Sequence, residues 1–377
     1  MPKLLLIANP ENRRATMFLD AWRRRTDAPV VVVPYLDLFD GRSGWEMLDS
    51  AADDDTVVRI ESPGENFDVE RQLLALGSTR AEEEGIPSIS AQQAESLEFD
   101  HGRILYPRQW YLGFCRLLEK IGCSLPEGVR YMNPPADIAL MFDKPSCHAR
   151  CLEGEIPVPQ SLGAIGSCDE LIARMDDAGI DRVFVKIANG SSASGVAAVH
   201  RTRSGTRAVT TVEMTDDGRY YNSLKLQCYR EPTDLARLID WICSQQAHVE
   251  RWLPKAVLGR MSLDLRVVVI AGHARHTVVR QSTGPMTNLH LGGRRGDLDA
   301  LKEKIGPARW QAVQRTCERV MTLFPGSLYA GIDVLLLPGG RSHAILEANT
   351  FGDLLPGVLC DGMDTYEAET MAVAVRE

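Results

Sequence analysis

The sequence predicts a chain of the α/β and α+β classes, in which a Rossmann-like parallel-sheet domain precedes a second part of mixed strands and helices. In the first third, apolar runs of strand length alternate with helical apolar spacing, and this β-α-β order favours a parallel sheet with helices on its faces. From residue 133 onward, prolines break that order and strands follow one another through short turns. The length of 377 residues, at about 150 residues per domain, indicates two or three domains.

The first third supplies the elements of the parallel sheet. The apolar run at residues 4–9 predicts the first strand, and apolar side chains at helical spacing predict a helix over residues 14–25. Residues 29–37 and 56–62 predict the next two strands, and a helix over residues 68–76 follows the turn SPGEN. Because helices separate these strands, we expect the strands to run parallel.

The remainder of the chain predicts further strands and helices. A proline-bearing segment over residues 133–163 contains one short helix, and a loop of small residues at 189–195 joins two strands. The expected elements are a helix over 169–178, strands over 182–188 and 195–201, a helix over 234–243, strands over 247–253, 263–272 and 274–282, a helix over 310–323, and a final strand pair over 330–338 and 342–349.

Composition and charge exclude several classes of protein. With 44% hydrophobic and 25% charged residues, the chain has the composition of a globular protein rather than a disordered or fibrous one. The net charge of −9 has the wrong sign for a protein that binds nucleic acid or anionic membranes. No apolar run approaches the roughly 18 residues that span a bilayer, and the N-terminal run is too short for a signal peptide. We therefore expect a cytoplasmic protein.

The cysteines predict neither disulfides nor a metal centre. Nine cysteines, an odd number scattered singly along the chain, do not form a disulfide framework. Cys147, His148 and Cys151 lie within about one helical turn, but a structural zinc site takes four ligands and no second close pair occurs in the sequence. We interpret Cys147 and Cys151 as two buried thiols on a helix.

The final strand pair carries three side chains that suit a metal ion. Asp333 lies in the first strand, Glu347 and Asn349 lie in the second, and GGR forms the turn between them. Because side chains alternate along a strand, Glu347 and Asn349 face the same side, and pairing through the turn would bring Asp333 to them. Hard oxygen ligands of this kind suit Mg²⁺, with phosphates and water completing its octahedron. A solvated hairpin is the alternative, although an apolar strand rarely holds a carboxylate without a partner.

Two lysines are candidate phosphate ligands. Lys186 lies in an apolar strand just before the small-residue loop at 189–195, where backbone N–H groups can approach a phosphate closely. The segment is not the GxxxxGK[ST] nucleotide loop, because the lysine precedes the glycines and a strand follows. Lys144, after the prolines, is a second candidate cation, and by itself it would be an ordinary surface lysine.

Two arginines are embedded in neighbouring strands. Arg266 lies in LDLRVVV and Arg280 in HTVVRQS, and Asn288 follows in the loop TNLHLGG. Arginines in apolar strands need an anionic partner, which a phosphate or a carboxylate would supply.

Taken in order, these segments resemble the ATP-grasp superfamily of ATP-dependent carboxylate-amine or carboxylate-thiol ligases, with RimK-like character from DLRVVVIAG through TNLHLGG to EAN. The resemblance runs from about residue 133 to the end and implies a two-lobed ATP-grasp fold after an N-terminal pre-ATP-grasp domain. The implied domains are a substrate-binding domain over residues 1–135, a small lid domain over 136–245, and a C-terminal domain with the metal site over 246–377.

The resemblance also implies which residues bind ATP. Lys144 matches the first ATP-binding lysine, which contacts the α-phosphate, and Lys186 matches the second. The implied ATP-binding set is Lys144, Lys186, Ser191, Ser192, Ser194, Gly195, Glu250, Arg251 and Trp252. The last three match a hinge whose backbone reads adenine. Members often have Gln-Glu-aromatic-apolar there, so Val249 and Arg251 depart from the pattern.

Catalytic and metal-binding roles are implied in the same way. In the family, certain residues face the transferred phosphoryl group and the acyl phosphate, and they are matched here by Arg266, Arg280 and Asn288. The family's magnesium ligands are matched by Asp333, Glu347 and Asn349. The implied cofactors are ATP and one or two Mg²⁺ ions, for which Mn²⁺ can substitute. Metal ions, lysine and arginine would neutralise the charge spread over the transferring phosphoryl group.

The resemblance implies formation of an amide. A carboxylate of an amino acid, a peptide or a biosynthetic intermediate would be activated as an acyl phosphate and joined to an amine, releasing ADP and phosphate. The alternatives are a thiol nucleophile, an ATP-binding regulatory protein without ligase activity, and a small-molecule kinase of the same fold. We expect small-molecule or peptide substrates and neither nucleic acid nor membrane as a partner. A homodimer is compatible with the sequence.

Candidate substrate contacts lie in the first third. Arg59 and Ser62 are at the end of a predicted strand, the edge at which open parallel sheets bind ligands. Arg108 and Trp110 lie in YPRQWYLG, which mixes cations and aromatic rings as many ligand pockets do. We predict that these four residues hold a carboxylate-bearing substrate. Packing of aromatic rings at a domain junction is the alternative for Trp110.

Overall fold

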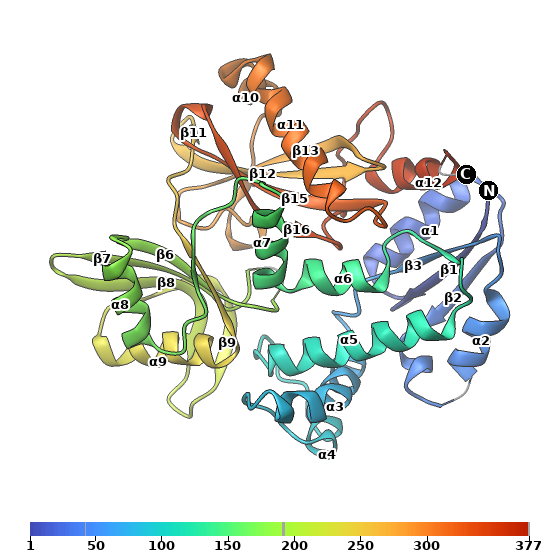
Figure 1. Ribbon diagram of the computed structural model, residues 1–377, viewed down its shortest axis with the longest axis horizontal. Helices are drawn as coiled ribbons and strands as arrows, with labels where there is room; N and C mark the ends of the chain where they lie inside the picture. The colour runs from blue at the N-terminus through green and yellow to red at the C-terminus, as the bar shows by residue number, and fades with distance from the viewer. Residues whose placement is uncertain (42, 191–192, 376–377) are drawn as a thin grey trace.

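The computed structural model describes residues 1–41, 43–190 and 193–375, which form three sheets in chain order (Figure 1). The first is the parallel sheet of the N-terminal domain. The second belongs to the lid, by which we mean β5 to β10, residues 161–251. The third belongs to the large unit, by which we mean α6, α7 and the elements from β11 to β16.

The N-terminal sheet has the order β2-β1-β3-β4, and all its strands are parallel. Its strands are β1 (Lys3–Ala8), β2 (Val30–Pro34), β3 (Thr56–Ile60) and β4 (Arg130–Tyr131). Alternate residues of β1 enter different cores: Leu5 and Ile7 pack beneath α2, α3 and α5, whereas Leu4 and Leu6 pack against α1. This period of two covers both faces of the sheet with helices, as the β-α-β order predicts.

The helices of this domain are long enough to cover the sheet. Their bounds are α1 (Arg13–Arg25), α2 (Ser43–Ala51), α3 (Phe67–Glu83), α4 (Ala91–Glu95) and α5 (Pro107–Ser124). The side chain of Asn12 caps α1, and Asn66 caps α3. The predicted strands and helices of this third are confirmed, whereas α2, α4 and α5 are additional. Residues 107–113 form the first turns of α5.

The lid is a six-stranded sheet with two helices on one face. Its order is β5-β10-β6-β7-β8-β9. The elements are β5 (Ser161–Gly163), α8 (Cys168–Asp177), β6 (Arg182–Ile187), β7 (Val196–Thr202), β8 (Gly205–Met214), β9 (Tyr220–Tyr229), α9 (Pro232–Ser244) and β10 (Ala247–Arg251). Apolar side chains of α8 and α9 pack on the sheet. The hairpin of β8 and β9 was not among the predicted elements.

The predicted boundaries of the lid need correction. The predicted boundary between residues 245 and 246 would separate β10 from its own sheet, because β10 pairs with β6 along its whole length. At the other end, α6 (Pro135–Phe142) and α7 (Lys144–Glu153) contribute Met141, Cys147 and Cys151 to the core of the large unit. Sequence order could not show this, because both segments join one unit through non-local packing.

The large unit contains the third sheet, of order β14-β13-β12-β15-β16, with β11 paired to β12. Its elements are β11 (Val257–Leu258), β12 (Met261–Ile270), β13 (His273–Ser282), β14 (Arg294–Arg295), α10 (Leu298–Ile305), α11 (Pro307–Thr322), β15 (Tyr329–Leu336) and β16 (His343–Asn349). Odd-numbered residues of β12 such as Leu265 and Val267 enter the core with α10 and α11. On the opposite face, Val268 and Ile270 pack against α1 and the C-terminal helix.

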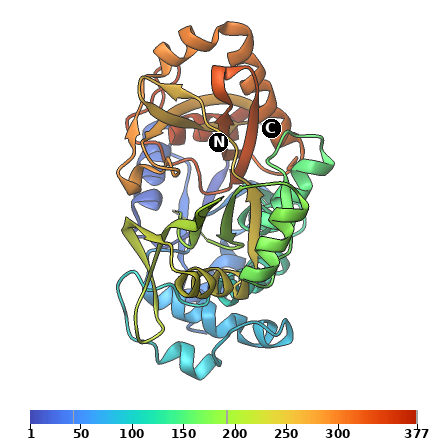
Figure 2. The same cartoon turned by 90° about the vertical axis from the view of Figure 1, so that its left-hand side faces the viewer.

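The C-terminal helix α12 (Thr365–Val375) returns to the N-terminal domain and packs beside α1, so both termini lie close together (Figure 1). In the perpendicular view the lid faces the viewer, between α10 and α11 above and the helices α3 and α4 below (Figure 2). Among the described residues, no helix combines the length and the apolar character that crossing a membrane requires.

A buried cluster of charges fastens the N-terminal domain to the loop after β16 and to α12. Arg59 is 0% exposed, and its guanidinium lies 2.7 Å from Asp353 and 2.7 Å from Glu369. It also contacts Glu61 on its own segment at 2.5 Å. Arg14 binds both Glu61 and Asp353. Arg59 therefore has no side available for a substrate, and the prediction that it binds one is wrong.

Arg59→Met is expected to lower the free energy of unfolding by about 3–5 kcal/mol, because the variant leaves buried carboxylates without their cation. Chemical denaturation measures the loss. Arg80→Met is the matched control, since Arg80 pairs with Glu119 at the surface, where an ion pair contributes less than about 1 kcal/mol. Equal losses of unfolding free energy in the two variants would contradict the role of Arg59 as the buried cation of this cluster.

The same cluster predicts a dependence of stability on pH. Burial, reinforced by Asp353, raises the pKa of Glu369 well above its ordinary value despite the attraction of Arg59. The folded chain thus holds this proton more tightly than the unfolded chain, and the resulting stability is lost as the pH rises through the raised pKa. Glu369→Gln, which has no carboxyl group to ionise, is therefore expected to lose less stability than the wild type as the pH rises above 4.5, the ordinary pKa of glutamate. Urea unfolding measures the free energy of unfolding of both proteins at each pH, and an identical pH dependence in the two would refute this prediction.

Candidate active site

A row of charged side chains crosses one face of the third sheet. Arg266 on β12 is paired in register with Asp333 on β15, and Asp333 is paired with Glu347 on β16. Asp264, also on β12, is paired with Arg280 on β13. Directly opposed residues of antiparallel strands project from the same face, so the register brings all five together. The predicted meeting of Asp333 with Glu347 is confirmed.

Asp333 is the centre of this row. Arg266 donates from Nε to Oδ1 at 2.5 Å and from Nη2 to Oδ2 at 3.1 Å, and Nη2 of Arg280 lies 3.2 Å from Oδ1. Burial alone would raise the pKa of Asp333, but the two guanidinium groups hold it well below its ordinary value. The carboxylate is therefore ionised and faces the site with two cations beside it.

Glu347 and Asn349 continue the row at the end of β16. The Asn349 amide nitrogen donates to Glu347 Oε1 at 2.9 Å, which turns the amide oxygen away from that carboxylate. Behind them the following loop returns so closely that a Cβ at Gly331 would lie 2.5 Å from Gly352 O. Arg266 Nη1 donates to that same carbonyl at 3.1 Å. The glycines thus allow Arg266 to hold the loop that follows Asn349.

The two predicted ATP-binding lysines approach the row from different elements. Lys144, the first residue of α7, places Nζ 3.9 Å from Glu347 and donates to Gly190 O at 2.5 Å. Lys186 on β6 donates to Glu250 on β10 at 2.5 Å. Burial lowers the pKa of Lys144. Burial also acts to lower the pKa of Lys186, but Glu250, Glu347 and Asp333 together raise it above its ordinary value. Both cations are held ready at the junction between the lid and the large unit.

Glu250 is the best-buried carboxylate on the lid side. Its side chain is 2% exposed, and its second oxygen lies 3.3 Å from Nε2 of His248. Burial would raise the pKa of Glu250, but Lys186 and His248 lower it to about 2. The ionised glutamate fixes Lys186, and this contact was not predicted from the sequence.

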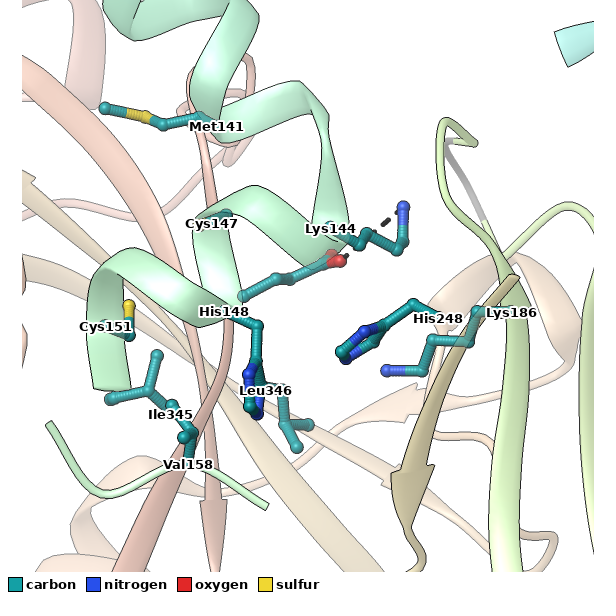
Figure 3. Close-up of a pocket in the computed structure, with 11 residues that line it drawn as sticks. Met141, Lys144, Cys147, His148, Cys151, Val158, Lys186, His248, Ile345 and Leu346 are labelled. Carbon is teal, nitrogen blue, oxygen red and sulfur yellow. Dashed lines mark ion pairs between the residues drawn. The ribbon is translucent and has the colours of Figure 1, made fainter. Parts of the chain in front are cut away.

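A small cavity lies between these groups (Figure 3). Its lining includes Lys144, Lys186, Glu347, His148 and His248, contributed by α7, β6, β16 and β10. The imidazole rings of His148 and His248 lie 5.0 Å apart, and Leu346 lies beside them. The cavity encloses about 10 Å³, about the space of one water molecule. This space is too small for a nucleobase.

The hinge residues lie at the end of β10. The Arg251 amide donates to Gln160 O at 2.8 Å, and the Trp252 amide donates to Arg182 O at 2.9 Å. The Trp252 ring packs on Phe184 and belongs to a small apolar cluster with Met286 of the large unit. Both amides are thus engaged within the protein, and adenine recognition by this segment stays a prediction.

The small-residue loop lies only partly within the described residues. Ser191 and Ser192, two of its predicted ATP contacts, lie outside them. Gly195 has a φ of 65° and its carbonyl accepts from Ile187, so the described end of the loop turns back onto β6. The roles of Ser194 and Gly195 stay predictions, as does that of Asn288, which caps a short 3₁₀ helix at Leu289–Leu291.

Two of the predicted substrate contacts have other partners. Arg108 donates twice to Glu84 and once to Asp143, each at 2.9 Å, so its guanidinium connects α5 with the start of α7. The Trp110 ring packs 5.5 Å from Phe114 and 5.5 Å from Phe142. In this structure both side chains pack the domain junction, and their roles as substrate contacts stay predictions. Ser62 is partly exposed at the end of β3 and stays a candidate.

Sequence reasoning missed one residue of the row, Asp264, and two residues that contact it, Lys255 and Thr287. Asp264 accepts from Nε of Arg280 at 2.7 Å, and its other oxygen accepts from Lys255 and Thr287. The position of Asp264, two residues before Arg266 on one strand face, was a usable signal. Lys255 and Thr287 lie in loops, where spacing carries no information about side-chain direction.

No protein-family model and no curated protein sequence matches the chain. Solved structures resemble it over its whole length. D-cycloserine synthetase DcsG has a TM-score of 0.55 and 13% identity, with 99% of each chain covered. The macrocyclase MdnC bound with precursor peptide MdnA, from Microcystis aeruginosa MRC, has a TM-score of 0.55 and 13% identity, with 100% of each chain covered.

A third similar structure identifies the fold. It is a RiPP-associated ATP-grasp ligase from Chryseobacterium gregarium in complex with ADP and a leader and core peptide, with a TM-score of 0.54 and 11% identity, covering 100% of this chain and 98% of the other. The chain has the ATP-grasp fold. This confirms the predicted fold class. The ATP-grasp lobes are the lid and the large unit, and the N-terminal parallel sheet precedes them.

The residues at the ATP-grasp junction fit ATP and a divalent metal chemically. Asp333, Glu347 and Asn349 present two carboxylates and an amide, the oxygen ligands that Mg²⁺ takes, and phosphate oxygens would complete the set. In the part of the chain that the structure describes, no cluster of three His, Cys, Asp or Glu side chains forms a self-sufficient metal centre.

A double-mutant cycle tests the lid contact. Lys186→Met, Glu250→Gln and the double variant are expected to give a coupling energy of about 1–3 kcal/mol, because each single change leaves a buried partner unpaired. Urea unfolding of the four proteins measures it. The surface pair Glu170–Arg174 on α8 is the control, for which about 0.5 kcal/mol or less is expected. A coupling energy as small as that of the control pair would contradict a buried ion pair between Lys186 and Glu250.

Proposed function

We propose that this protein is an ATP-dependent ligase that activates a carboxylate as an acyl phosphate and joins it to an amine, releasing ADP and phosphate. The observation that carries the proposal is the meeting of Asp333 and Glu347 with Lys144 and Arg266 at the junction of the two lobes. Carboxylates for a metal and cations for phosphates are what phosphoryl transfer from ATP requires. The solved structures of similar fold support the same class of reaction.

Each group has a separate task in this proposal. Lys144 and Lys186 hold the nucleotide phosphates from α7 and β6, and Glu250 keeps Lys186 in place through their 2.5 Å contact. Mg²⁺, when bound by Asp333, Glu347 and Asn349, would neutralise phosphate charge during the transfer. Arg266 and Arg280, on the same sheet face, stabilise charge on the transferring group and on the acyl carbon's oxygen.

The lid explains how an acyl phosphate survives. Such an anhydride reacts with water, so the site has to close over it. In this structure Phe184 of the lid and Trp252, which follows it in the chain after β10, already belong to one apolar cluster with Met286 of the large unit. Closure of the lid on the nucleotide would bring Lys186 to the phosphates and exclude water in one movement.

The substrates are proposed to be amino-acid or peptide derivatives. The similar structures are a D-cycloserine synthetase, a macrocyclase with a precursor peptide, and a ligase with a leader and core peptide. In this chain the open end of the parallel sheet, at the switch point between β1 and β3, lies beside the loop that follows Asn349. A carboxylate held at this edge would be near the metal ligands.

A screen for substrates tests the proposal directly. The protein is incubated with ATP, Mg²⁺ and pools of amino acids and short peptides, and ADP release is followed with and without hydroxylamine. Substrate-dependent ADP release with a trapped hydroxamate is expected, because hydroxylamine captures an acyl phosphate. A stable phosphorylated product without hydroxamate would indicate a kinase instead.

Glu347→Ala is expected to abolish substrate-dependent ADP release, because it removes a proposed metal ligand and a contact of Lys144. The measurement is turnover at saturating Mg²⁺. Glu303→Ala, an exposed position on α10, is the control and is expected to retain activity. Unchanged turnover of Glu347→Ala would refute the metal assignment.

A further inference from the structure

Lys255 is a buried lysine at the candidate site to which the proposed mechanism gives no role. It lies in the loop between β10 and β11, and its side chain is 8% exposed. The neighbouring backbone fixes it, because the Ala256 amide donates to Leu336 O at 2.7 Å and the Ala256 carbonyl accepts from Leu263 at 3.0 Å. The loop thus holds Lys255 against β12 and β15.

The hydrogen bonds of Lys255 define two of the three positions around its Nζ. It donates to Asp264 Oδ2 at 3.2 Å and to Thr287 Oγ1 at 2.8 Å. The Thr287 hydroxyl donates its own proton to Asp264, so Thr287 can only accept from the lysine. Both bonds use an N–H of Lys255, whether it is ammonium or amine.

Of the three positions on Nζ, therefore, only the third differs between the protonated and the neutral form of Lys255. An ammonium has a proton there, and a neutral amine has a lone pair, while the bonds to Asp264 and Thr287 persist in both forms. Loss of one proton costs no hydrogen bond to these partners. This is the arrangement that a reversible proton acceptor needs.

Burial of Lys255 favours release of that proton. Burial is the largest influence, and Arg280 on β13 and Lys186 on β6 add to it, whereas Asp264 on β12 opposes them. Together they lower the pKa of Lys255 from its ordinary value. The remaining facing group, Thr287, is uncharged.

We propose that Lys255 is the residue that accepts the proton of the amine when the amide bond forms. This inference rests on the proposed ligase function and extends it. Asp264 connects Lys255 to Arg280, which is proposed to stabilise the acyl oxygen, so the two lie on opposite oxygens of one carboxylate. The proton acceptor and the oxyanion donor are thereby held at a fixed separation.

The step balances as follows. The lone pair of the incoming amine forms the C–N bond at the acyl carbon, and the C=O pair moves to oxygen beside Arg280. One N–H proton passes to the lone pair of Lys255, and the N–H bonding pair stays on the amide nitrogen. The C=O bond then re-forms as the C–O bond to phosphate breaks, and phosphate leaves with that electron pair.

Asp333, Asp264 and His248 are less suited to this role. Asp333 and Asp264 are engaged by two and three donors respectively, and the pKa of Asp333 is lowered. His248 is engaged by Glu250 on the lid side of the site. Arginine does not lose its proton in proteins.

The first measurement is the titration of Lys255 in the full chain. The chain contains only eight lysines, so isotope-labelled lysine gives few NMR signals, and Lys255→Arg identifies the one that belongs to Lys255. We expect the pKa of Lys255 to lie below the ordinary value of a lysine side chain. A pKa at or above that ordinary value would overturn the proposal.

The second measurement separates activation from amide formation. Lys255→Met, Lys255→Arg and the control Lys302→Arg are assayed with ATP, Mg²⁺ and the amino-acid and peptide pools. In Lys255→Met we expect amide formation to fall by about 100-fold or more, the usual contribution of a positioned base, while hydroxylamine trapping is largely retained. Hydroxylamine is a weaker base than an alkyl amine, so its attack depends less on Lys255.

Lys255→Arg decides between proton acceptance and charge. Arginine keeps the cation and the donors but cannot accept a proton, so we expect amide formation as low as in Lys255→Met. We also expect that the rate of amide formation increases with pH in the wild type, as Lys255 loses its proton, and that this increase is absent in Lys255→Arg. Restoration of amide formation by arginine, or an equal loss of hydroxylamine trapping, would overturn the proposal. No ATP turnover by the wild type with any pool would instead overturn the ligase function itself, and this inference with it.

Discussion

Buried charges have to be paired, and this requirement decides how the units of the chain are joined. At the interface with the N-terminal domain, Arg59 is fully enclosed and binds carboxylates from three separate segments of the sequence. Two of them, Asp353 and Glu369, belong to the C-terminal part of the chain. Aromatic rings of Phe18 and Tyr329 cover the guanidinium. An enclosed cation of this kind strongly disfavours separation of the two units.

The same requirement shapes the candidate site. Asp333 is held by two arginines, Glu250 by Lys186, and Asp264 by Arg280 and Lys255. A metal and a nucleotide would bring charges of both signs into this network, so binding amounts to an exchange of partners instead of the burial of new charge. The loop after Asn349 joins the two networks, since Arg266 holds Gly352 and Arg59 holds the adjacent Asp353. This loop therefore connects the candidate site to the N-terminal domain.

The residues that sequence reasoning placed well lie on regular strands. Asp333 and Glu347 came together because period-two alternation and a short turn fix which side chains face each other across a hairpin. Lys186 and Arg266 were found for the same reason, as polar residues in apolar runs. Lys255 and Thr287 escaped notice because they lie in loops. Arg59 was misassigned because a charged residue at a strand end looks the same in sequence whether a ligand or another domain covers it.

The sequence by itself determined the alternation of strands and helices, the parallel character of the first sheet, and the hairpin that carries Asp333 and Glu347. Each of these follows from local periodicity, which acts over a few neighbouring residues. Only the tertiary structure decided that β10 completes the lid, that α7 belongs to the large unit, and that α12 returns to cover α1. These arrangements depend on which apolar faces and buried charges find partners at long range, and no local pattern encodes that choice.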